Sequence, residues 1–288
     1  MRLVTLNDGY PGCRRAGILT PGAIIDVSVL WPDGPDTVLG ILQHQMLDEL
    51  RAIDLDAVPE EALYPLDTPL WAPVDRPGKI LALGLNSLGH CRENDKPRPP
   101  IPLVFSKATT ALTGPASDIV IPSGTSQVDW EVELCLVIGR EAKGVSVDRA
   151  MDYVAGYTVM NDVSARDWQF AVSQWHRAKS ADTFAPMGPS LVTLDEAGDW
   201  RKMRLTCCVN GQTMQTAMAG EDMIFSPPEV VSFISQSETL EVGDCISLGT
   251  PAGVGYYTKP QRFLKPGDVV ECDIPGLGCI RNKVVARK

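Results

Sequence analysis

Two turns of the same kind, each leading into a strand, most constrain the fold of this chain. Residues 240–244 and 264–268 both end in Gly-Asp, about 24 residues apart, and each precedes an apolar segment typical of a strand. Asn210-Gly211, between two further strand segments, is the dipeptide most typical of a two-residue hairpin. Because such turns, rather than long helices, connect the strands from residue 79 onward, the pattern excludes a doubly wound sheet and favours a rolled or barrel-like mixed sheet. We therefore predict an α+β fold that is mainly β.

The first part of the chain has a different pattern, which indicates a small α/β module. Apolar spacing and flanking turn residues predict its strands and its helix at residues 2–6, 16–18, 24–27 and 36–53. Three prolines at positions 69, 73 and 77 are typical of a linker. We predict a small N-terminal module at residues 1–70, a linker at 71–78 and the main domain at 79–288.

Charge and hydropathy exclude several classes of protein. The formal net charge of −10 and the lack of any Lys/Arg-rich run disfavour a nucleic-acid partner. No segment approaches the roughly 18 consecutive apolar residues of a membrane span, and the N-terminus lacks the features of a signal peptide. The eight cysteines contain no Cys-x-x-Cys pair, which favours reduced, buried thiols. We predict a cytoplasmic protein without a membrane or nucleic-acid partner.

Two acidic residues interrupt an apolar segment at residues 128–138, which is predicted to be one strand. Side chains alternate along a strand, so Glu131 and Glu133 are expected on the same face. Neighbouring carboxylates repel each other unless a cation lies between them, and hard oxygen ligands favour Mg2+, Mn2+ or Ca2+ over zinc. Asp162, at the end of the next predicted strand, is a third candidate ligand. The alternative is a solvated polar face for the two glutamates and an ordinary turn residue for Asp162.

His90 and Glu93 form a candidate acid–base pair. They follow a predicted strand at residues 79–85, and one helical turn after His90 would bring Glu93 beside the imidazole. A histidine with an acidic partner is a common general base near neutral pH. The alternatives are an ordinary surface pair or a thiol nucleophile at Cys91, next to His90.

Further candidates lie in helices and turns after residue 145. A helix beginning at Asp148 is predicted to end at Gly156, and Ser164 is predicted to cap another, from which Arg166 and Gln169 face the same way. Lys179 is expected in a loop. The glycine-rich turn at 249–255 offers backbone N–H groups that could hold an anion, but it lacks the Lys-Ser/Thr ending of a P-loop.

Taken in order, these segments resemble the fumarylacetoacetate hydrolase family over about residues 79–285. No single motif is decisive, but their number and order are difficult to obtain by chance. The motifs are Gly-Leu-Asn…His-x-x-Glu (84–93), Asp-Trp-Glu-x-Glu-Leu (129–134), Gly-Tyr-Thr-x-x-Asn-Asp-x-Ser-Ala-Arg-Asp-x-Gln (156–169), Lys-Ser-x-Asp-Thr-Phe-x-Pro-x-Gly-Pro (179–189) and Gly-Thr-Pro-Ala-Gly-Val-Gly (249–255).

The resemblance implies a mixed β-roll domain, a homodimer and a set of site residues. It implies that the ligands of Mg2+ or Mn2+ (or of Ca2+ in crystals) are Glu131, Glu133 and Asp162. It implies that the catalytic residues are His90, Glu93 and Lys179, and that the substrate contacts are Asn86, Arg166, Gln169 and Thr250. The chain departs from the family where a tyrosine often follows the asparagine of the first motif and Ser87 stands here.

The expected activity is metal-dependent hydrolysis of a carbon–carbon bond in a small anionic 2-oxo acid. The substrate would be a 2,4-dioxo acid, acylpyruvate or fumarylacetoacetate-like, which releases a pyruvate-type enolate. The alternatives are an oxaloacetate-type decarboxylase or a 2-hydroxy-alkadienedioate isomerase, because both also stabilise an enolate. A non-catalytic metal-binding scaffold is a further alternative.

Overall fold

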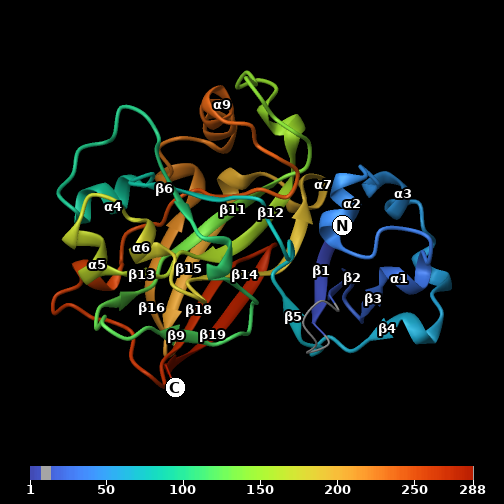
Figure 1. The fold of residues 1–288 in the computed structure, drawn as a ribbon, viewed down its shortest axis with the longest axis horizontal. Coiled ribbons are helices and arrows are strands. Elements are labelled where there is room, and N and C mark those ends of the chain that lie inside the picture. Colours follow the sequence, from blue (N-terminus) through green and yellow to red (C-terminus); the bar gives the residue numbers. More distant parts are fainter. Residues whose placement is uncertain (8–13, 288) are drawn as a thin grey trace.

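Two β-sheets form the centre of the molecule (Figure 1). The computed structural model describes residues 1–7 and 14–287. In the larger sheet, neighbouring strands follow the order β4-β3-β2-β1-β14-β12-β11-β17-β6-β7, while β5 pairs with β1 and β8 with β14. The strands of this sheet are β1 (Arg2–Asn7), β2 (Arg14–Leu19), β3 (Ile24–Asp26), β4 (Leu63–Tyr64), β5 (Leu70–Trp71), β6 (Ile80–Gly84), β7 (Leu103–Lys107), β8 (Leu112–Thr113), β11 (Val132–Ile138), β12 (Val154–Asn161), β14 (Ala185–Thr193) and β17 (Cys245–Ser247).

The smaller sheet contains the predicted hairpin and the second Gly-Asp turn. Its order is β16-β15-β18-β19-β9, and a separate two-stranded sheet pairs β10 with β13. Asn210 (φ 53°) and Gly211 (φ 76°) form the turn of the β15–β16 hairpin, as predicted. In both Gly-Asp turns the aspartate side chain accepts a backbone N–H three residues earlier, at 2.7 and 2.8 Å. The strands of these two sheets are β9 (Ile119–Ile121), β10 (Val128–Asp129), β13 (Ser164–Ala165), β15 (Arg204–Val209), β16 (Gln212–Met218), β18 (Val269–Ile274) and β19 (Gly278–Ala286).

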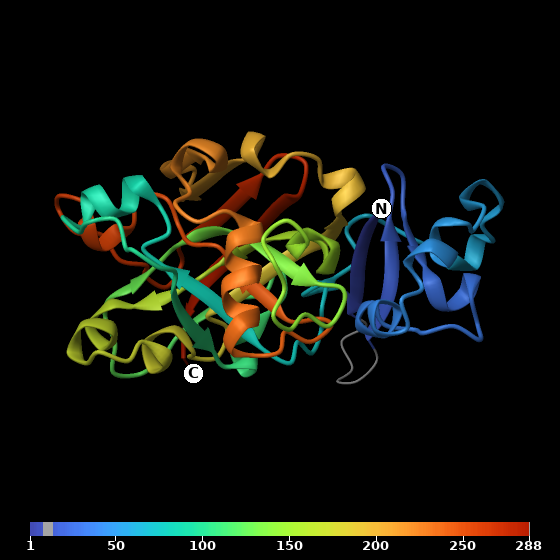
Figure 2. The same ribbon diagram turned by 90° about the horizontal axis from the view of Figure 1, so that it is seen from above.

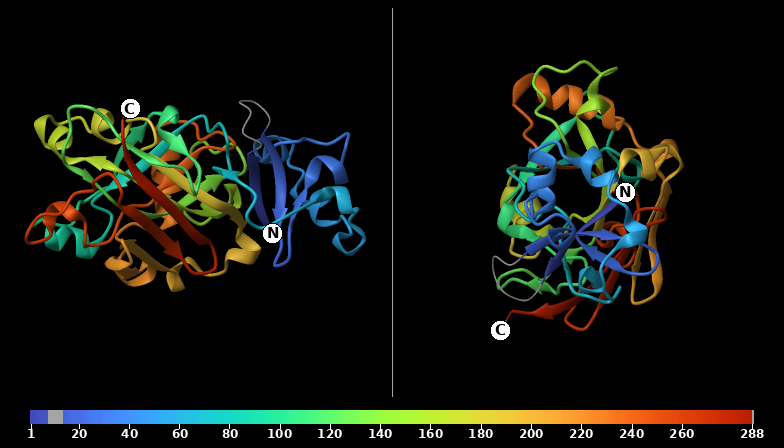
Figure 3. Two further views of the ribbon diagram at one scale, coloured as in Figure 1. Left: turned by 90° about the horizontal axis from the view of Figure 1, so that it is seen from below. Right: turned by 90° about the vertical axis from the view of Figure 1, so that its right-hand side faces the viewer.

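The described helices are short, and most of them lie at the ends and edges of the sheets. The α-helices are α1 (Val27–Leu30), α2 (Val38–Gln43), α3 (Leu47–Arg51), α4 (Leu88–Glu93), α5 (Arg166–Ala171), α6 (His176–Lys179), α7 (Leu194–Ala197), α8 (Ala219–Asp222) and α9 (Pro227–Ser237). The 3-10 turns are η1 (Leu55–Ala57), η2 (Glu60–Ala62), η3 (Thr109–Ala111), η4 (Ala150–Tyr153), η5 (Trp200–Lys202) and η6 (Gly255–Tyr257). Helix α9 lies over the upper side of the molecule (Figure 2), and β18 and β19 cross the lower side (Figure 3, left). Among the described residues, no helix is long and apolar enough to cross a membrane.

The N-terminal elements lie at one end of the long axis (Figure 2). Their strands belong to the larger sheet, because β1 pairs with β14 and Leu3 lies opposite Leu191. The predicted helix at 36–53 is wrong as one element, because Gln45 adopts a left-handed φ of 58° between α2 and α3. The Gln45 side chain donates to the carbonyls of Leu42 and Gly139, so the break also ties the N-terminal elements to the rest of the chain. The boundary at residues 71–78 stays a prediction.

The acidic strand and its neighbours differ from the prediction in three ways. The segment 128–138 is divided into β10 and β11, because the N–H of Glu131 donates to the Asn161 side chain at 2.9 Å instead of a strand partner. Gly156 does not end a helix. It lies inside β12, where an added Cβ would come within 2.1 Å of the Val192 carbonyl oxygen. Ser164 lies in β13 and donates to the Asp162 carbonyl, so it does not cap α5.

Candidate active site

Helix α4 holds the predicted acid–base pair at the end of β6. The Ser87 side chain accepts the His90 N–H at 2.9 Å and starts the helix, and this bond accounts for a serine at the position where the motif departs from the family. One helical turn then brings His90 Nδ1 within 2.7 Å of Glu93 Oε1, as predicted. A carboxylate only accepts hydrogen bonds, so Nδ1 carries a proton, and it is Nε2 that has the lone pair when the imidazole acts as a base.

Three carboxylates converge beside this pair. Glu131, Glu133 and Asp162 each offer an oxygen, and these atoms all lie within 4.8 Å of one another. The three residues are nearly inaccessible to solvent, at 4%, 1% and 0% exposure. The alternatives of a solvated face and an ordinary turn residue are therefore wrong for the placement of these side chains.

Buried cations pair with two of the three carboxylates. Lys179 Nζ lies 2.6 Å from both Glu131 Oε2 and Asp162 Oδ2, and Lys107 reaches the other Asp162 oxygen. Arg166 lies 2.7 Å from Glu131 Oε1. Burial opposes ionisation of Glu131, but the charges of Lys179 and Arg166 together outweigh it and lower its pKa.

Glu133 is the carboxylate without a cationic partner among the described residues. Its Oε2 accepts hydrogen bonds from the Ser247 hydroxyl at 2.6 Å and from the Gly249 N–H at 2.8 Å. Burial, followed by repulsion from Asp162 and Glu131, raises its pKa well above the usual range. A cation in contact with all three carboxylates would remove that repulsion, so the donor set fits a hard divalent ion.

A charge count of the buried cluster leads to the same conclusion. Four carboxylates and three cationic side chains are buried together, so the acidic groups outnumber the basic ones by one. The carboxylates are Asp129, Glu131, Glu133 and Asp162, and the cations are Lys107, Lys179 and Arg166. The unmatched carboxylate is Glu133, and its raised pKa reflects the missing cation.

The glycine-rich turn at 249–255 binds anions, but these are side chains of the protein itself. The Gly253 N–H donates to Glu93 Oε2 at 2.8 Å, and the Gly249 N–H donates to Glu133. The Gly255 N–H donates to Asp129 Oδ1 at 2.7 Å. One turn therefore positions Glu93, which pairs with His90, Glu133 of the triad and Asp129, which pairs with Arg166.

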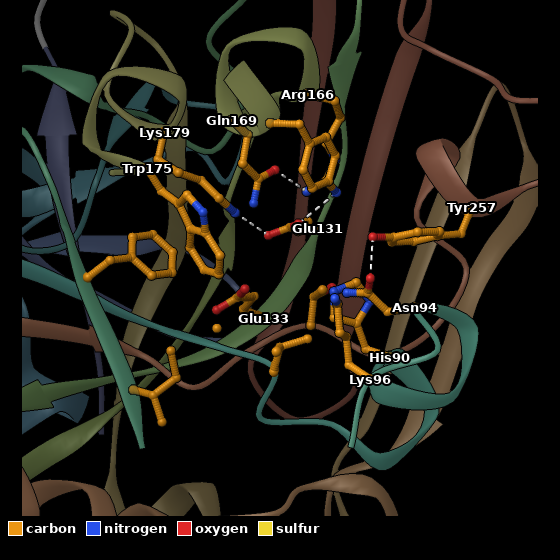
Figure 4. Close-up of a pocket in the computed structure, with 16 residues that line it drawn as sticks. His90, Asn94, Lys96, Glu131, Glu133, Arg166, Gln169, Trp175, Lys179 and Tyr257 are labelled. Atoms are coloured by element: carbon orange, nitrogen blue, oxygen red, sulfur yellow. Dashed lines mark hydrogen bonds and ion pairs between the residues drawn. The ribbon is translucent and has the colours of Figure 1, made fainter. Parts of the chain in front are cut away.

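His90 of the dyad and Glu131 and Glu133 of the triad line one cavity of about 120 Å³. This space suits a small acid. In Figure 4, His90, Asn94 and Lys96 lie on one wall, and Trp175 and Lys179 lie across the cavity. Among the other lining residues are Phe105, Glu131, Glu133, Arg166, Gln169, Phe170, Thr250 and Tyr257.

Most of the predicted substrate contacts lie at this cavity, but Asn86 does not line it. Its side chain bonds to the backbone of Phe225 and Leu248, which fixes the segment before α4, and its contact with substrate stays a prediction. Arg166 Nη1 donates to Gln169 Oε1 at 2.8 Å, as their spacing predicted. Lys179 was predicted in a loop, and it is instead the buried last residue of α6.

Two buried residues of the cluster were not among the predicted site residues. Asp129 belongs to one of the sequence motifs, but the motif alone assigns it no role. Its carboxylate accepts hydrogen bonds from Arg166 Nε at 2.8 Å and from three backbone N–H groups. Lys107 ends β7 with no local signal of a partner, because its contact with Asp162 spans 55 residues. Only the pairing of β6 with β7 places it at the site.

The alternative nucleophile Cys91 has a protonated, shielded thiol. Burial and, to a lesser extent, Asp222 raise its pKa, and Sγ lies 3.4 Å from the Leu85 carbonyl oxygen. These surroundings disfavour a thiolate mechanism.

Replacing Asp129 by asparagine is expected to destabilise the protein by about 3–5 kcal/mol, because Arg166 would lose one of its buried anionic partners and the amide nitrogen would face N–H donors. Urea unfolding monitored by circular dichroism measures the change. Asp273→Asn is the matched control, since burial raises the pKa of Asp273 and no cation pairs with it among the described residues. Equal midpoints for the two variants would contradict the assignment.

Comparison with known proteins identifies relatives over the whole chain. Residues 79–285 match the family described as Fumarylacetoacetate (FAA) hydrolase C-terminal. Oxaloacetate tautomerase FAHD2A, mitochondrial, of Bos taurus is 41% identical over 99% of this chain and 92% of that protein. The structure of fumarylacetoacetate hydrolase from Exiguobacterium antarcticum superposes with a TM-score of 0.88 at 32% identity and covers 100% of both chains.

A third relative carries another activity in its name. The 2-hydroxyhepta-2,4-diene-1,7-dioate isomerase from Mycobacterium marinum superposes with a TM-score of 0.76 at 33% identity, covering 100% of this chain and 99% of that one. The mixed, mainly β fold and the resemblance drawn from the motifs are thereby confirmed. The relatives are enzymes, and their names cover tautomerisation, hydrolysis and isomerisation.

Proposed function

Because this chain belongs to the fumarylacetoacetate hydrolase family, we propose that it is a metal-dependent tautomerase of a small, oxaloacetate-like 2-oxo acid. The reaction moves a proton between C3 and the 2-oxo oxygen. The observation that carries the proposal is that His90, paired with Glu93, lines the same cavity as Glu131 and Glu133 of the carboxylate triad. A proton transfer of this kind needs a base beside a site that stabilises enolate charge.

The residues that would hold Mg2+ or Mn2+ are Glu131, Glu133 and Asp162. When bound, the ion would polarise the 2-oxo group and favour the charge that develops on its oxygen. A divalent ion would also offset the repulsion among these carboxylates and attract an anionic substrate.

The side chains of this chain would carry the proton transfer. His90 Nε2 is the base that takes a proton from C3 of the keto form or from the hydroxyl of the enol. The imidazolium, which Glu93 stabilises, then gives a proton to the other atom of the enolate, the oxygen or C3. The Gln169 amide nitrogen points into the cavity in Figure 4, where it can donate a hydrogen bond to the substrate. Lys179 adds positive charge at the same wall. Phe105, Phe170 and Trp175 make part of the cavity wall apolar.

Hydrolysis of a carbon–carbon bond is the second candidate, favoured by the full-length similarity to a solved fumarylacetoacetate hydrolase. The same His90 would then remove a proton from water instead of C3. The 41% identity to an oxaloacetate tautomerase, against 32% to this hydrolase, favours the proton transfer. Decarboxylation of an oxaloacetate-like acid uses the same enolate and differs by the release of CO2.

One assay separates these reactions. The ultraviolet absorbance of freshly dissolved enol-oxaloacetate is expected to fall faster with enzyme and Mg2+ than with Mg2+ alone or with enzyme and chelator, without release of pyruvate or CO2. Cleavage of an acylpyruvate without this acceleration would replace the proposal by hydrolysis. Enzyme-dependent CO2 release would replace it by decarboxylation, and no turnover in any arm would favour a metal-binding scaffold.

Three further properties stay part of the proposal. We expect a homodimer, no nucleic-acid or membrane partner and a cytoplasmic location. The name of the bovine relative places that protein in mitochondria.

A further inference from the structure

One cation at the cavity has no ionic partner within the described part of the chain. The other strongly basic side chains that line the cavity are Arg166, which pairs with Asp129 and Glu131, and Lys179, which pairs with Glu131 and Asp162. Lys96 lines the same cavity and forms no ion pair with any described residue. Its charge is therefore available to a ligand.

The backbone of Lys96 is fixed to the helix that carries the base. Helix α4 ends with Asp95 in a left-handed conformation (φ 51°), the Asp95 N–H donates to the Arg92 carbonyl at 3.2 Å, and the Lys96 N–H donates to the Cys91 carbonyl at 2.9 Å. These two bonds are the Schellman ending of a helix, and Pro97 prevents the helix from continuing. Lys96 and His90 therefore share one rigid support.

Lys96 lies on the wall across the cavity from Lys179 (Figure 4), with His90 beside it. A four-carbon acid whose 2-oxo end faces the carboxylate triad would direct its far end away from Lys179. Aromatic side chains line much of the remaining cavity, and they offer no positive charge to a second carboxylate.

We propose that Lys96 binds the distal carboxylate of the substrate and makes the site selective for dicarboxylic 2-oxo acids. This inference rests on the proposed function, because it assumes that the 2-oxo end lies at the triad. Lys96 would act as a specificity residue, and the chemical step would remain with His90.

The test compares two stable ligands that differ mainly in the distal carboxylate. Isothermal titration of the Mg2+-loaded protein measures the affinities for malate and for 2-hydroxybutyrate. Lys96→Gln is expected to lower the preference for malate over 2-hydroxybutyrate about tenfold, equivalent to about 1.4 kcal/mol. Lys96→Arg is expected to restore most of the preference.

Arg98 provides the matched control two residues away. Its guanidinium donates to the Ile224 carbonyl at 3.5 Å and lies 5.9 Å from the centre of the Phe225 ring, and it does not line the cavity. Arg98→Gln removes the same charge from the same segment and is expected to keep the wild-type preference. An equal loss in Arg98→Gln and Lys96→Gln would reduce the effect to net charge and overturn the assignment.

The proposed function and this inference fail in different ways. A wild-type protein that lacks tautomerase activity but prefers malate through Lys96 would refute the proposed function and keep the binding role. An unchanged preference in Lys96→Gln, or a wild-type protein that binds neither ligand, would overturn the inference whatever the activity.

Discussion

Replacing His90 by glutamine is expected to lower turnover by about 100-fold or more, because the site loses its general base. Glutamine has a similar length but cannot take a proton near neutral pH. The imidazole donates one hydrogen bond to Glu93 and is not part of the carboxylate triad, so Mg2+ binding is expected to persist. Initial rates with saturating Mg2+ measure the first effect, and the Mg2+-dependent rise in melting temperature measures the second.

Glu93→Gln is the graded control for this experiment. It removes the charge that stabilises the imidazolium and leaves the ring in place, so its loss of turnover is expected to be smaller than that of His90→Gln. Near-normal turnover of the His90 variant would exclude His90 from the mechanism. A lost response to Mg2+ would show that the substitution had disturbed the carboxylates.

Glu131→Gln and Glu133→Gln are expected to change the stability of the metal-free protein in opposite directions, although both residues belong to the triad. Glu131→Gln leaves Lys179 and Arg166 short of a buried anion and is expected to cost about 3–5 kcal/mol. Glu133→Gln removes a charge that two carboxylates repel, and its amide oxygen can accept the same two hydrogen bonds. Its metal-free melting temperature is expected to rise by about 2–4 °C at pH 8.

The pH dependence tests the cause of this difference. The pKa of Glu133 is raised in the folded protein. As the pH rises above the ordinary carboxyl range, Glu133 therefore loses its proton in the unfolded chain before it does so in the folded protein. The wild type becomes less stable over this range. Glu133→Gln lacks this loss of stability. In the presence of chelator, the difference in stability between the variant and the wild type should therefore increase between about pH 5 and pH 8. Both variants should also lose most of the stabilisation by Mg2+. A Glu133 variant that is less stable than the wild type at every pH, or that keeps its full Mg2+ response, would contradict the assignment.

The sequence predicted the parts of the site that depend on local spacing. Glu131 and Glu133 are two residues apart, and His90 and Glu93 are one helical turn apart, so local geometry alone brings each pair together. The Asn210-Gly211 hairpin was predictable for the same reason, because the turn requires positive φ at both residues.

Residues whose role depends on distant contacts could not be assigned from the sequence. Lys107 reaches Asp162 only because β7 pairs with β6, and no local pattern marks it. Gly156 resembles the end of a helix, but close packing against Val192 explains the glycine there. The helix at 36–53 has continuous apolar spacing, yet hydrogen bonds from Gln45 to Leu42 and Gly139 break it.

The turn at 249–255 limits where substrate preference can be redesigned. Its backbone N–H groups hold Glu93, Glu133 and Asp129 at once. An insertion or a shift in this turn would therefore move the partner of His90, a proposed metal ligand and the ion-pair partner of Arg166 together. An engineer who wishes to change the accepted acid would leave this loop intact. The segment that follows α4, from Asn94 onward, can be altered one side chain at a time.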